Sequence, residues 1–107
     1  MDDRTLLTLA AKAAGIELSH WNDGQEPYSS GLGFILPCNR MWNPLADDGD
    51  ALRMAVKLGL KIEHHDNSVV VWFDYFGTGY IPYDGDACKA TRRAIVQSAA
   101  EIGEEMS

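Results

Sequence analysis

The sequence contains few cysteines and no long apolar run. Cys38 and Cys88 stand far apart and form no CxxC pair or Cys/His cluster, so we expect reduced, partly buried thiols. Because the longest apolar runs are short and interrupted, no segment is expected to span a membrane. The N-terminal stretch MDDRTLL is acidic and lacks the hydrophobic region of a signal peptide. These features together predict a protein of the cytoplasm.

Basic residues are also scarce. The chain has 9 lysines and arginines against 16 aspartates and glutamates, which gives a net charge of −7 and an isoelectric point near 4.7. Binding to a phosphate backbone depends on clustered basic side chains, so general nucleic-acid binding is not expected. An acidic surface suits a basic partner or the imitation of nucleic acid, although solubility is the simpler explanation.

What is present is the composition of an ordinary globular domain. Hydrophobic residues make up 46% of the 107 residues and charged residues 23%. A chain of this size and composition can form a core without cross-links, and disorder is not expected. We therefore predict a single domain over residues 1–107.

Three segments have helical periodicity. The first runs from about Asp3 to Ala14 and ends at Gly15, which suits a left-handed C-terminal cap. The second covers residues 49–58 and ends at Gly59. The third runs from about Ala87 to Met106, and its periodicity predicts a buried face made of Thr91, Ile95, Ser98, Ile102 and Met106.

Alternating or β-branched segments predict four strands, at residues 16–21, 32–36, 60–64 and 69–76. The loop GTGYIPYDGD leaves room for a short edge strand at Tyr80–Ile81. The resulting order is αββαββα. Strands in hairpins predict an antiparallel sheet, and the apolar VVVWFDYF segment suggests that helices cover both of its faces. We therefore predict an α+β fold, an α/β/α sandwich with a central, mostly antiparallel sheet of about four strands.

A weak internal repeat accompanies this order. The segments LTLAAKAAGIEL and LRMAVKLGLKIE share a helix with a lysine at the same place, a glycine stop and a following strand. The segments DGDALR and DGDACK likewise open the second and third helices. The repeat predicts two αββ units that are closed by a final helix.

Aspartates gather before the second and third helices, namely Asp48, Asp50, Asp84 and Asp86. An aspartate at this place accepts hydrogen bonds from free backbone N–H groups and faces the positive end of the helix dipole. A calcium loop is the functional alternative. An EF-hand that began at Asp48 or Asp84 would need a glutamate at its twelfth position, where the sequence has Gly59 or Ile95. We interpret these aspartates as helix caps and expect neither a metal nor a cofactor.

Six residues are candidates for ligand or partner contacts, namely Trp42, Asn43, Tyr80, Tyr83, Arg92 and Arg93. The WNPL run allows Trp42 either to contact a ligand or to anchor the sheet. Tyr80 and Tyr83 belong to an aromatic cluster around a Gly/Pro loop, which suits stacking or an interface. Arg92 and Arg93 could clamp a phosphate or a carboxylate, or lie on an exposed helix face.

No catalytic constellation stands out. His64 and His65 lie beside Asp66 at an expected hairpin turn, and adjacent strand residues point in opposite directions, so we interpret this group as a solvated turn and not a metal site. Neither cysteine has a histidine near it in sequence, and no serine occupies a nucleophile elbow. We therefore predict no catalytic residues.

Three segments carry a resemblance to a known family, namely LLTLAAKAAGIEL, WNPLADDGDALRMAVKLGL and ATRRAIVQSAAEIGEEM. The chain resembles the small bacteriophage proteins of the phage ABA sandwich domain family over nearly its whole length. The WNPLxDDGDALR run is fairly specific, whereas the alanine-rich helices are not. The resemblance implies an α/β/α sandwich encoded in phage or prophage accessory regions, in the cytoplasm of the bacterial host, with no assigned activity.

The first functional expectation is a non-enzymatic accessory protein that binds a host or phage macromolecule, for example as an anti-defence inhibitor of a host nuclease. The second is a small-molecule binder, such as a sponge for a nucleotide signal, built from the aromatic and arginine candidates. A hydrolase that uses the aspartates and histidines is the third. Because the sheet edge near Tyr80–Tyr83 leaves unpaired backbone groups beside aromatic side chains, we also expect a homodimer through this loop.

Overall fold

The computed structural model describes residues 2–23 and 32–106. Within these residues there are three helices, α1 (Asp3–Ala14), α2 (Asp48–Leu58) and α3 (Ala87–Glu105). All three lie where the periodicity predicts them, within about two residues at each end. Most of the predicted loop NDGQEPYSSG lies outside the described residues.

The described strands form two antiparallel sheets. The first sheet has the order β1-β2-β3 and contains β1 (His20–Asp23), β2 (Leu32–Ile35) and β3 (Met41–Trp42). In the second sheet β5 (Ser68–Phe73) pairs with each of the other three strands, which are β4 (Lys61–His64), β6 (Phe76–Gly77) and β7 (Ile81–Pro82). The short strand β3 was not predicted, and the first predicted strand begins four residues later, at His20.

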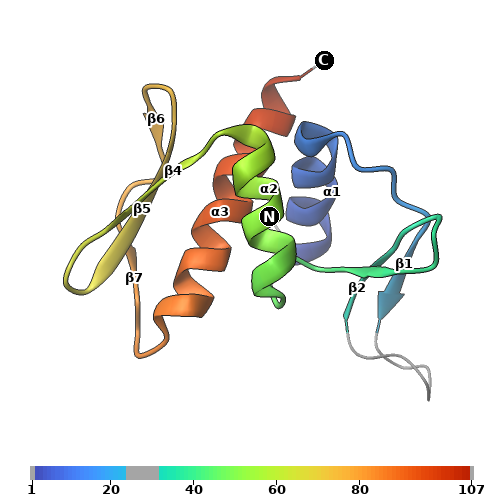
Figure 1. The fold of residues 1–107 in the computed structure, drawn as a ribbon, viewed down its shortest axis with the longest axis horizontal. Coiled ribbons are helices and arrows are strands. Elements are labelled where there is room, and N and C mark those ends of the chain that lie inside the picture. Colours follow the sequence, from blue (N-terminus) through green and yellow to red (C-terminus); the bar gives the residue numbers. More distant parts are fainter. Residues whose placement is uncertain (1, 24–31, 107) are drawn as a thin grey trace.

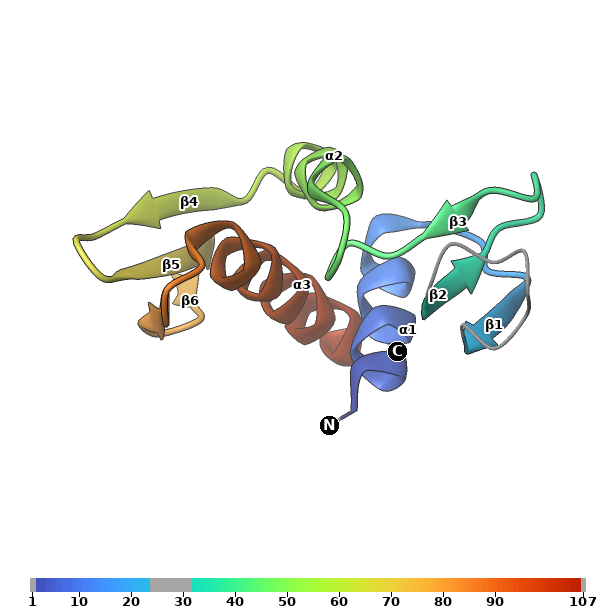
Figure 2. The same cartoon turned by 90° about the horizontal axis from the view of Figure 1, so that it is seen from below.

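The helices form a layer between the two sheets (Figure 1). The view in Figure 2 places β4, β5 and β6 on one side of α2, α3 and α1, and β1, β2 and β3 on the other. The predicted α+β sandwich of three helices and antiparallel strands is confirmed. The predicted single central sheet needs correction, since the strands make two sheets and the helices occupy the centre.

The two sheets stay separate because each αββ unit completes its own sheet. β2 has β1 on one side and β3 on the other, while β5 has β4 on one side and β6 and β7 on the other. Phe34 and Trp42 then pack the first sheet against the helical core, and Val69 and Val71 pack the second sheet against it. Val70 lies on the outer face of β5, where it is buried but does not belong to this core. The apolar residues of VVVWF that face outward therefore need no helix to cover them.

The central position of α3 explains its burial. Its buried residues are small or aliphatic on most of its circumference, namely Ala90, Ala94, Ile95, Val96, Ser98, Ala99, Ala100 and Gly103. A Cβ atom on Gly103 would overlap the backbone carbonyl of Leu9, so α1 and α3 are packed with their backbones in contact at this point. The predicted buried face of this helix was too narrow. Met106, which was predicted to be part of that face, lies just beyond the helix and is exposed.

The helix ends follow local capping rules. Asp86 caps α3 as predicted, and its side chain accepts a hydrogen bond from the Lys89 N–H. The N-cap of α2 is Asp47, whereas the predicted caps Asp48 and Asp50 lie in the first turn. Gly15 and Gly59 end α1 and α2 in the left-handed conformation, each with φ of 68°.

Both cysteines also differ from the prediction. Cys38 and Cys88 are free thiols and exposed instead of partly buried. Cys38 lies in the turn between β2 and β3, and Cys88 lies in the first turn of α3. Neither turn is covered by another element, which explains the exposure.

Candidate functional site

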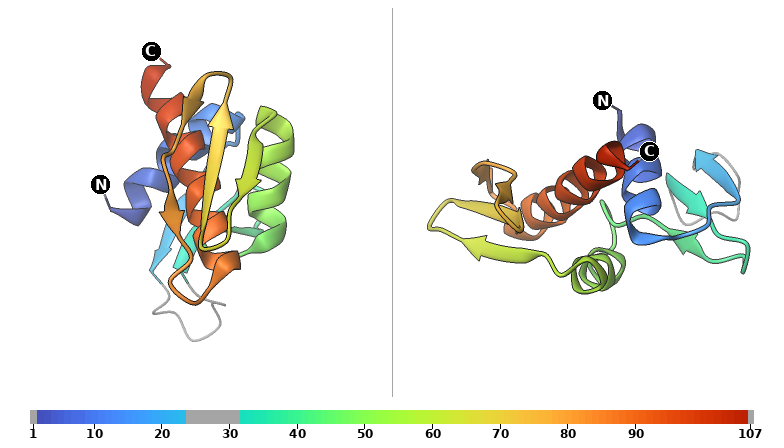
Figure 3. Two further views of the ribbon diagram at one scale, coloured as in Figure 1. Left: turned by 90° about the vertical axis from the view of Figure 1, so that its left-hand side faces the viewer. Right: turned by 90° about the horizontal axis from the view of Figure 1, so that it is seen from above.

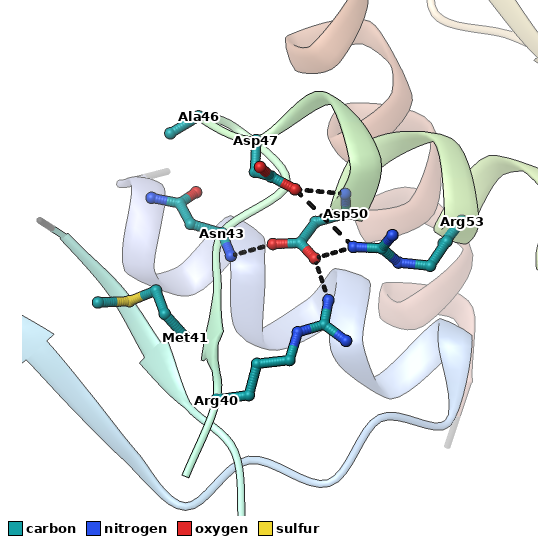
Figure 4. A pocket seen from close by; sticks show the side chains of 7 residues that line it. All are labelled: Arg40, Met41, Asn43, Ala46, Asp47, Asp50 and Arg53. Carbon is teal, nitrogen blue, oxygen red and sulfur yellow. Dashed lines mark hydrogen bonds and ion pairs between the residues drawn. The ribbon is translucent and has the colours of Figure 1, made fainter. Parts of the chain in front are cut away.

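The WNPLADDGD segment builds a buried carboxylate at Asp50. Asp50 lies in the first turn of α2 and is only 5% exposed. Its side chain accepts hydrogen bonds from Arg40 Nη2 at 2.6 Å, Arg53 Nη2 at 2.8 Å and the Asn43 backbone N–H at 3.0 Å (Figure 4). A buried carboxylate needs such donors, because an uncompensated charge is costly away from water. Asp50 therefore ties the loop after β3 to α2.

A pocket of about 510 Å³ lies beside this carboxylate. It is lined by Arg40, Met41, Asn43, Ala46, Asp47, Asp50 and Arg53. The two arginines are balanced by the two aspartates, and both guanidinium groups already face Asp50 within 2.8 Å. The pocket has no excess positive charge for a phosphate, so we assign the network a structural role.

The two candidate arginines, Arg92 and Arg93, are also engaged in structural contacts. Arg92 donates from Nε to the Leu45 carbonyl at 2.9 Å and from Nη1 to Asp48 Oδ1 at 2.7 Å. These bonds join α3 to the loop in front of α2 and to the first residue of α2. Arg93 donates to Asp3 Oδ1 at 3.3 Å and so joins α3 to the start of α1. Neither arginine projects toward the candidate tyrosines as a clamp.

The aromatic candidates do not converge on one pocket. Trp42 is buried in the first sheet, where it pairs with Phe34 across β2 and β3. Tyr80 and Tyr83 flank β7 in the second sheet, on the other side of the helical layer (Figure 1). Tyr80 is 71% exposed, and Tyr83 is half-buried with its hydroxyl 2.6 Å from His64 Nδ1. The geometry therefore gives no support to the nucleotide pocket expected from these residues.

The outer face of the second sheet carries a polar and aromatic cluster. Glu63 Oε2 lies 3.2 Å from His65 Nε2 and accepts a longer hydrogen bond from Trp72 Nε1 at 3.5 Å. The hydrogen bond with His65, followed by that from Trp72, lowers the pKa of Glu63. The ring of His65 also meets Tyr80 edge to face, with centroids 5.1 Å apart. His65 therefore interacts with Glu63 and Tyr80, while Asp48 pairs with Arg92. This histidine and this aspartate, which are of the residue types that a hydrolase would use, are not brought together.

Metal ligands do not gather in the described part of the chain. Among residues 2–23 and 32–106, no group of three histidine, cysteine, aspartate or glutamate side chains has the geometry to hold a metal ion. In the same part of the chain, no helix has the length and apolarity needed to cross a membrane.

An apolar groove lies between the β5–β6 hairpin and the C-terminal half of α3. It has a volume of about 620 Å³ and is lined by Phe73, Phe76, Ser98, Glu101, Ile102, Glu104, Glu105 and Met106. We call it the Phe76 groove. Figure 3 shows the hairpin running in front of α3, with β6 toward the end of the chain. The side chain of Phe76 is 74% exposed and that of Met106 is 43% exposed, so large apolar groups at this site remain in contact with water.

Carboxylates stand beside this apolar floor. Glu101 and Glu104 are three residues apart on α3, and Glu105 follows at the end of the helix. Partial burial, with a further contribution from the charge of Glu104, raises the pKa of Glu101. The groove thus combines an apolar floor with a concentration of negative charge.

Sequence reasoning missed the Phe76 groove. The periodicity assigns Ile102 and Met106 to the buried face of the last helix, and the apolar run places Phe73 and Phe76 in one continuous strand. The strand in fact turns at Asp74, which has a positive φ of 53°, and this turn brings Phe76 back beside Phe73. The signal available in the sequence was the Asp-Tyr pair within the apolar run, since aspartate tolerates the left-handed conformation in turns.

Comparison of the chain with protein-family models, curated proteins and solved structures gives no match. The resemblance to the phage ABA sandwich domain family accordingly stays an expectation from the sequence.

Proposed function

We propose that the chain is a non-enzymatic accessory protein that binds a protein partner through the Phe76 groove. The observation that carries this proposal is the exposure of two large apolar side chains, Phe76 and Met106, along one groove. Tyr75, Phe76 and Met106 are among the few large hydrophobic residues that the described surface exposes, and the latter two line the groove. Scattered apolar residues are normal on a surface, whereas a contiguous group beside a groove is typical of an interaction site.

The setting of this function is part of the proposal. The resemblance to phage proteins supports a role in the cytoplasm of a bacterial host during infection, and inhibition of a host defence protein is one concrete form of that role. The acidic net charge of −7 supports a partner with a basic surface. A homodimer through the Tyr80 edge is a separate part of the proposal, because it uses a different surface.

Site-specific photo-crosslinking in infected bacteria tests the proposal. A photoreactive phenylalanine analogue at position 76 is expected to crosslink one dominant protein partner. The same analogue at Val56, an exposed apolar position on α2, serves as the matched control and is expected to give no such band. Equal crosslinking at both positions, or none at position 76 together with substrate turnover by the purified protein, contradicts the proposal.

A further inference from the structure

We infer that the Phe76 groove binds a basic amphipathic helix of the partner, with apolar side chains on the groove floor and lysine or arginine side chains against Glu101, Glu104 and Glu105. This inference rests on the proposed function and adds the chemistry of the partner to it. It is carried by the apolar floor, by the charge at the end of α3 and by the shape of the two walls.

The apolar floor is large enough for side chains from another molecule. Phe73 and Phe76 come from the hairpin, Ile102 comes from the C-terminal end of α3, and Met106 follows directly after this helix. A volume of about 620 Å³ is of the size of ordinary ligand pockets. Covering Phe76 and Met106 would remove apolar surface from water, which is the main driving force of most protein associations.

The charges at the C-terminal end of α3 do not follow the pattern found in the other two helices. α1 and α2 each have an acidic residue in the first turn and a lysine in the last turn, as the helix dipole favours. α3 has neither, and Glu104 and Glu105 instead stand at its negative end. A departure from a local rule without a local gain is typical of a functional site.

The glutamates also repel one another. Glu101 and Glu104 are neighbours on the helix surface, and like charges at this spacing are unfavourable. None of the described residues that line the groove is basic. Lys12 reaches the end of α3, but its Nζ donates to the Met106 carbonyl at 2.7 Å and not to these carboxylates. Lys12 thus compensates the negative end of the helix, while cationic side chains of a partner would relieve the repulsion between the glutamates.

The walls favour a helix over a strand as the occupant. β6 is only the two residues Phe76–Gly77, so this edge offers few backbone groups for the addition of a further strand. A helix needs no such pairing, because it contributes apolar side chains at positions three and four apart to a groove. A second copy of the chain is disfavoured here, since it would bring its own net charge of −7 to an acidic groove.

Synthetic peptides test the inference with the whole protein. Three labelled helices of about 15 residues share one leucine and phenylalanine face and differ on the other face, which carries lysine, glutamine or glutamate. Fluorescence anisotropy is expected to show tightest binding of the lysine peptide. Raising the salt from about 0.05 M to 0.5 M is expected to weaken this binding severalfold, because exposed charges are screened.

Variants of the protein show where the peptide binds. They also distinguish the effect of the charges at the groove from the effect of the net charge of the protein. The double variant Glu104→Gln/Glu105→Gln is expected to weaken the lysine peptide by roughly tenfold. Glu17→Gln/Asp66→Asn removes the same number of charges at exposed positions away from the groove and is expected to leave binding nearly unchanged. Phe76→Asp is expected to abolish binding, whereas Tyr75→Asp, the adjacent hairpin position outside the groove lining, is the matched control.

Three outcomes overturn the inference. If the glutamine peptide binds as tightly as the lysine peptide and Phe76→Asp removes both, the groove binds protein without preference for charge and the proposed function stands. If both double variants weaken binding equally, only net charge is sensed. If no peptide binds, a basic helix is not the occupant, and the crosslinking at position 76 decides the proposed function independently.

Discussion

At the scale of single residues, the WNPLADDGD segment shows how a candidate site becomes a structural anchor. Asp50 is buried, yet three donors from three places in the chain reach it, namely Arg40, Arg53 and the Asn43 backbone. Such a group stabilises the fold only while its partners remain, because removing one side leaves the others without an acceptor.

Replacement of Asp50 tests this role. Asp50→Ala is expected to lower the free energy of unfolding by about 2 kcal/mol, since the Asn43 N–H loses its acceptor while the half-exposed arginines regain water. Urea denaturation followed by circular dichroism measures the change. Asp66→Ala, in the exposed turn between β4 and β5, is the control and should shift stability by less than about 0.5 kcal/mol. Equal effects of the two variants would contradict the anchor role.

Glu101 gives a pH-dependent prediction with a definite sign. Because its pKa in the folded state is raised, ionised Glu101 destabilises the fold, and this penalty disappears as the pH falls through the folded pKa. Glu101→Gln is therefore expected to raise the free energy of unfolding at pH 7 by at most about 0.5 kcal/mol, discounted for solvent screening. Denaturation at pH 7 and pH 3 should show the gain shrinking at the lower pH. A gain that grows as the pH falls would refute the assignment.

At the scale of elements, the contact between α1 and α3 dominates the helical layer. Both helices bury several alanines, and Gly103 lies against the Leu9 backbone. Because these side chains are small, the two helix axes can approach closely, and α3 can sit between α1 and the second sheet. The position of α3 in turn sets one wall of the Phe76 groove.

A substitution of alanine for Gly103 is expected to change the stability of the fold in the direction opposite to that predicted by helix propensity. Gly103→Ala should destabilise the fold by about 1–3 kcal/mol, because the added methyl group must displace backbone, although alanine is the better helix former. Gly49→Ala in α2 is the control, since the nearest atoms to a Cβ there are side-chain ends of Arg53 and Asp47 at 3.1 to 3.2 Å and not backbone atoms. Thermal unfolding of both variants measures the difference. A stabilised Gly103→Ala protein would show that the helices are further apart than described.

At the scale of the whole molecule, the internal repeat explains the separation of the sheets. Each αββ unit folds its strands on its own side of the helices, and α3 closes both units at the centre (Figure 2). The edge of the second sheet at β7 then remains outside, with Tyr80 exposed and Pro82 removing one backbone donor. This edge is where the predicted homodimer would form.

The homodimer is tested by light scattering. The wild-type protein at micromolar concentration is expected to show about twice the monomer mass of 11.8 kDa. Tyr80→Asp should return it to the monomer mass, while Tyr75→Asp, at a residue 94% exposed on the β5–β6 hairpin, should not. Higher salt should favour the dimer because it screens the repulsion between two acidic chains. A monomeric wild-type protein would remove the prediction.

The sequence by itself determined the local features of this protein. Helical periodicity and glycine stops placed α1 and α2, since a left-handed cap at Gly15 or Gly59 depends on a few neighbouring residues. Alternation placed β4 and a β-branched run placed β5 for the same reason. The absence of lysine from the end of α3 could be read directly. The capping role of Asp86 needed only its own helix.

Only the tertiary structure decided which of these features meet. Whether the αββ units merge or separate depends on which faces the helices bury. The small Gly103 and the buried alanines of α1 and α3 let α3 take the centre. The candidates Trp42 and Tyr80 fell on opposite sides because their strands belong to different sheets. The Phe76 groove joins residues from β5, β6 and α3. Local periodicity carries no information about contacts between distant segments, because those depend on how the whole core packs.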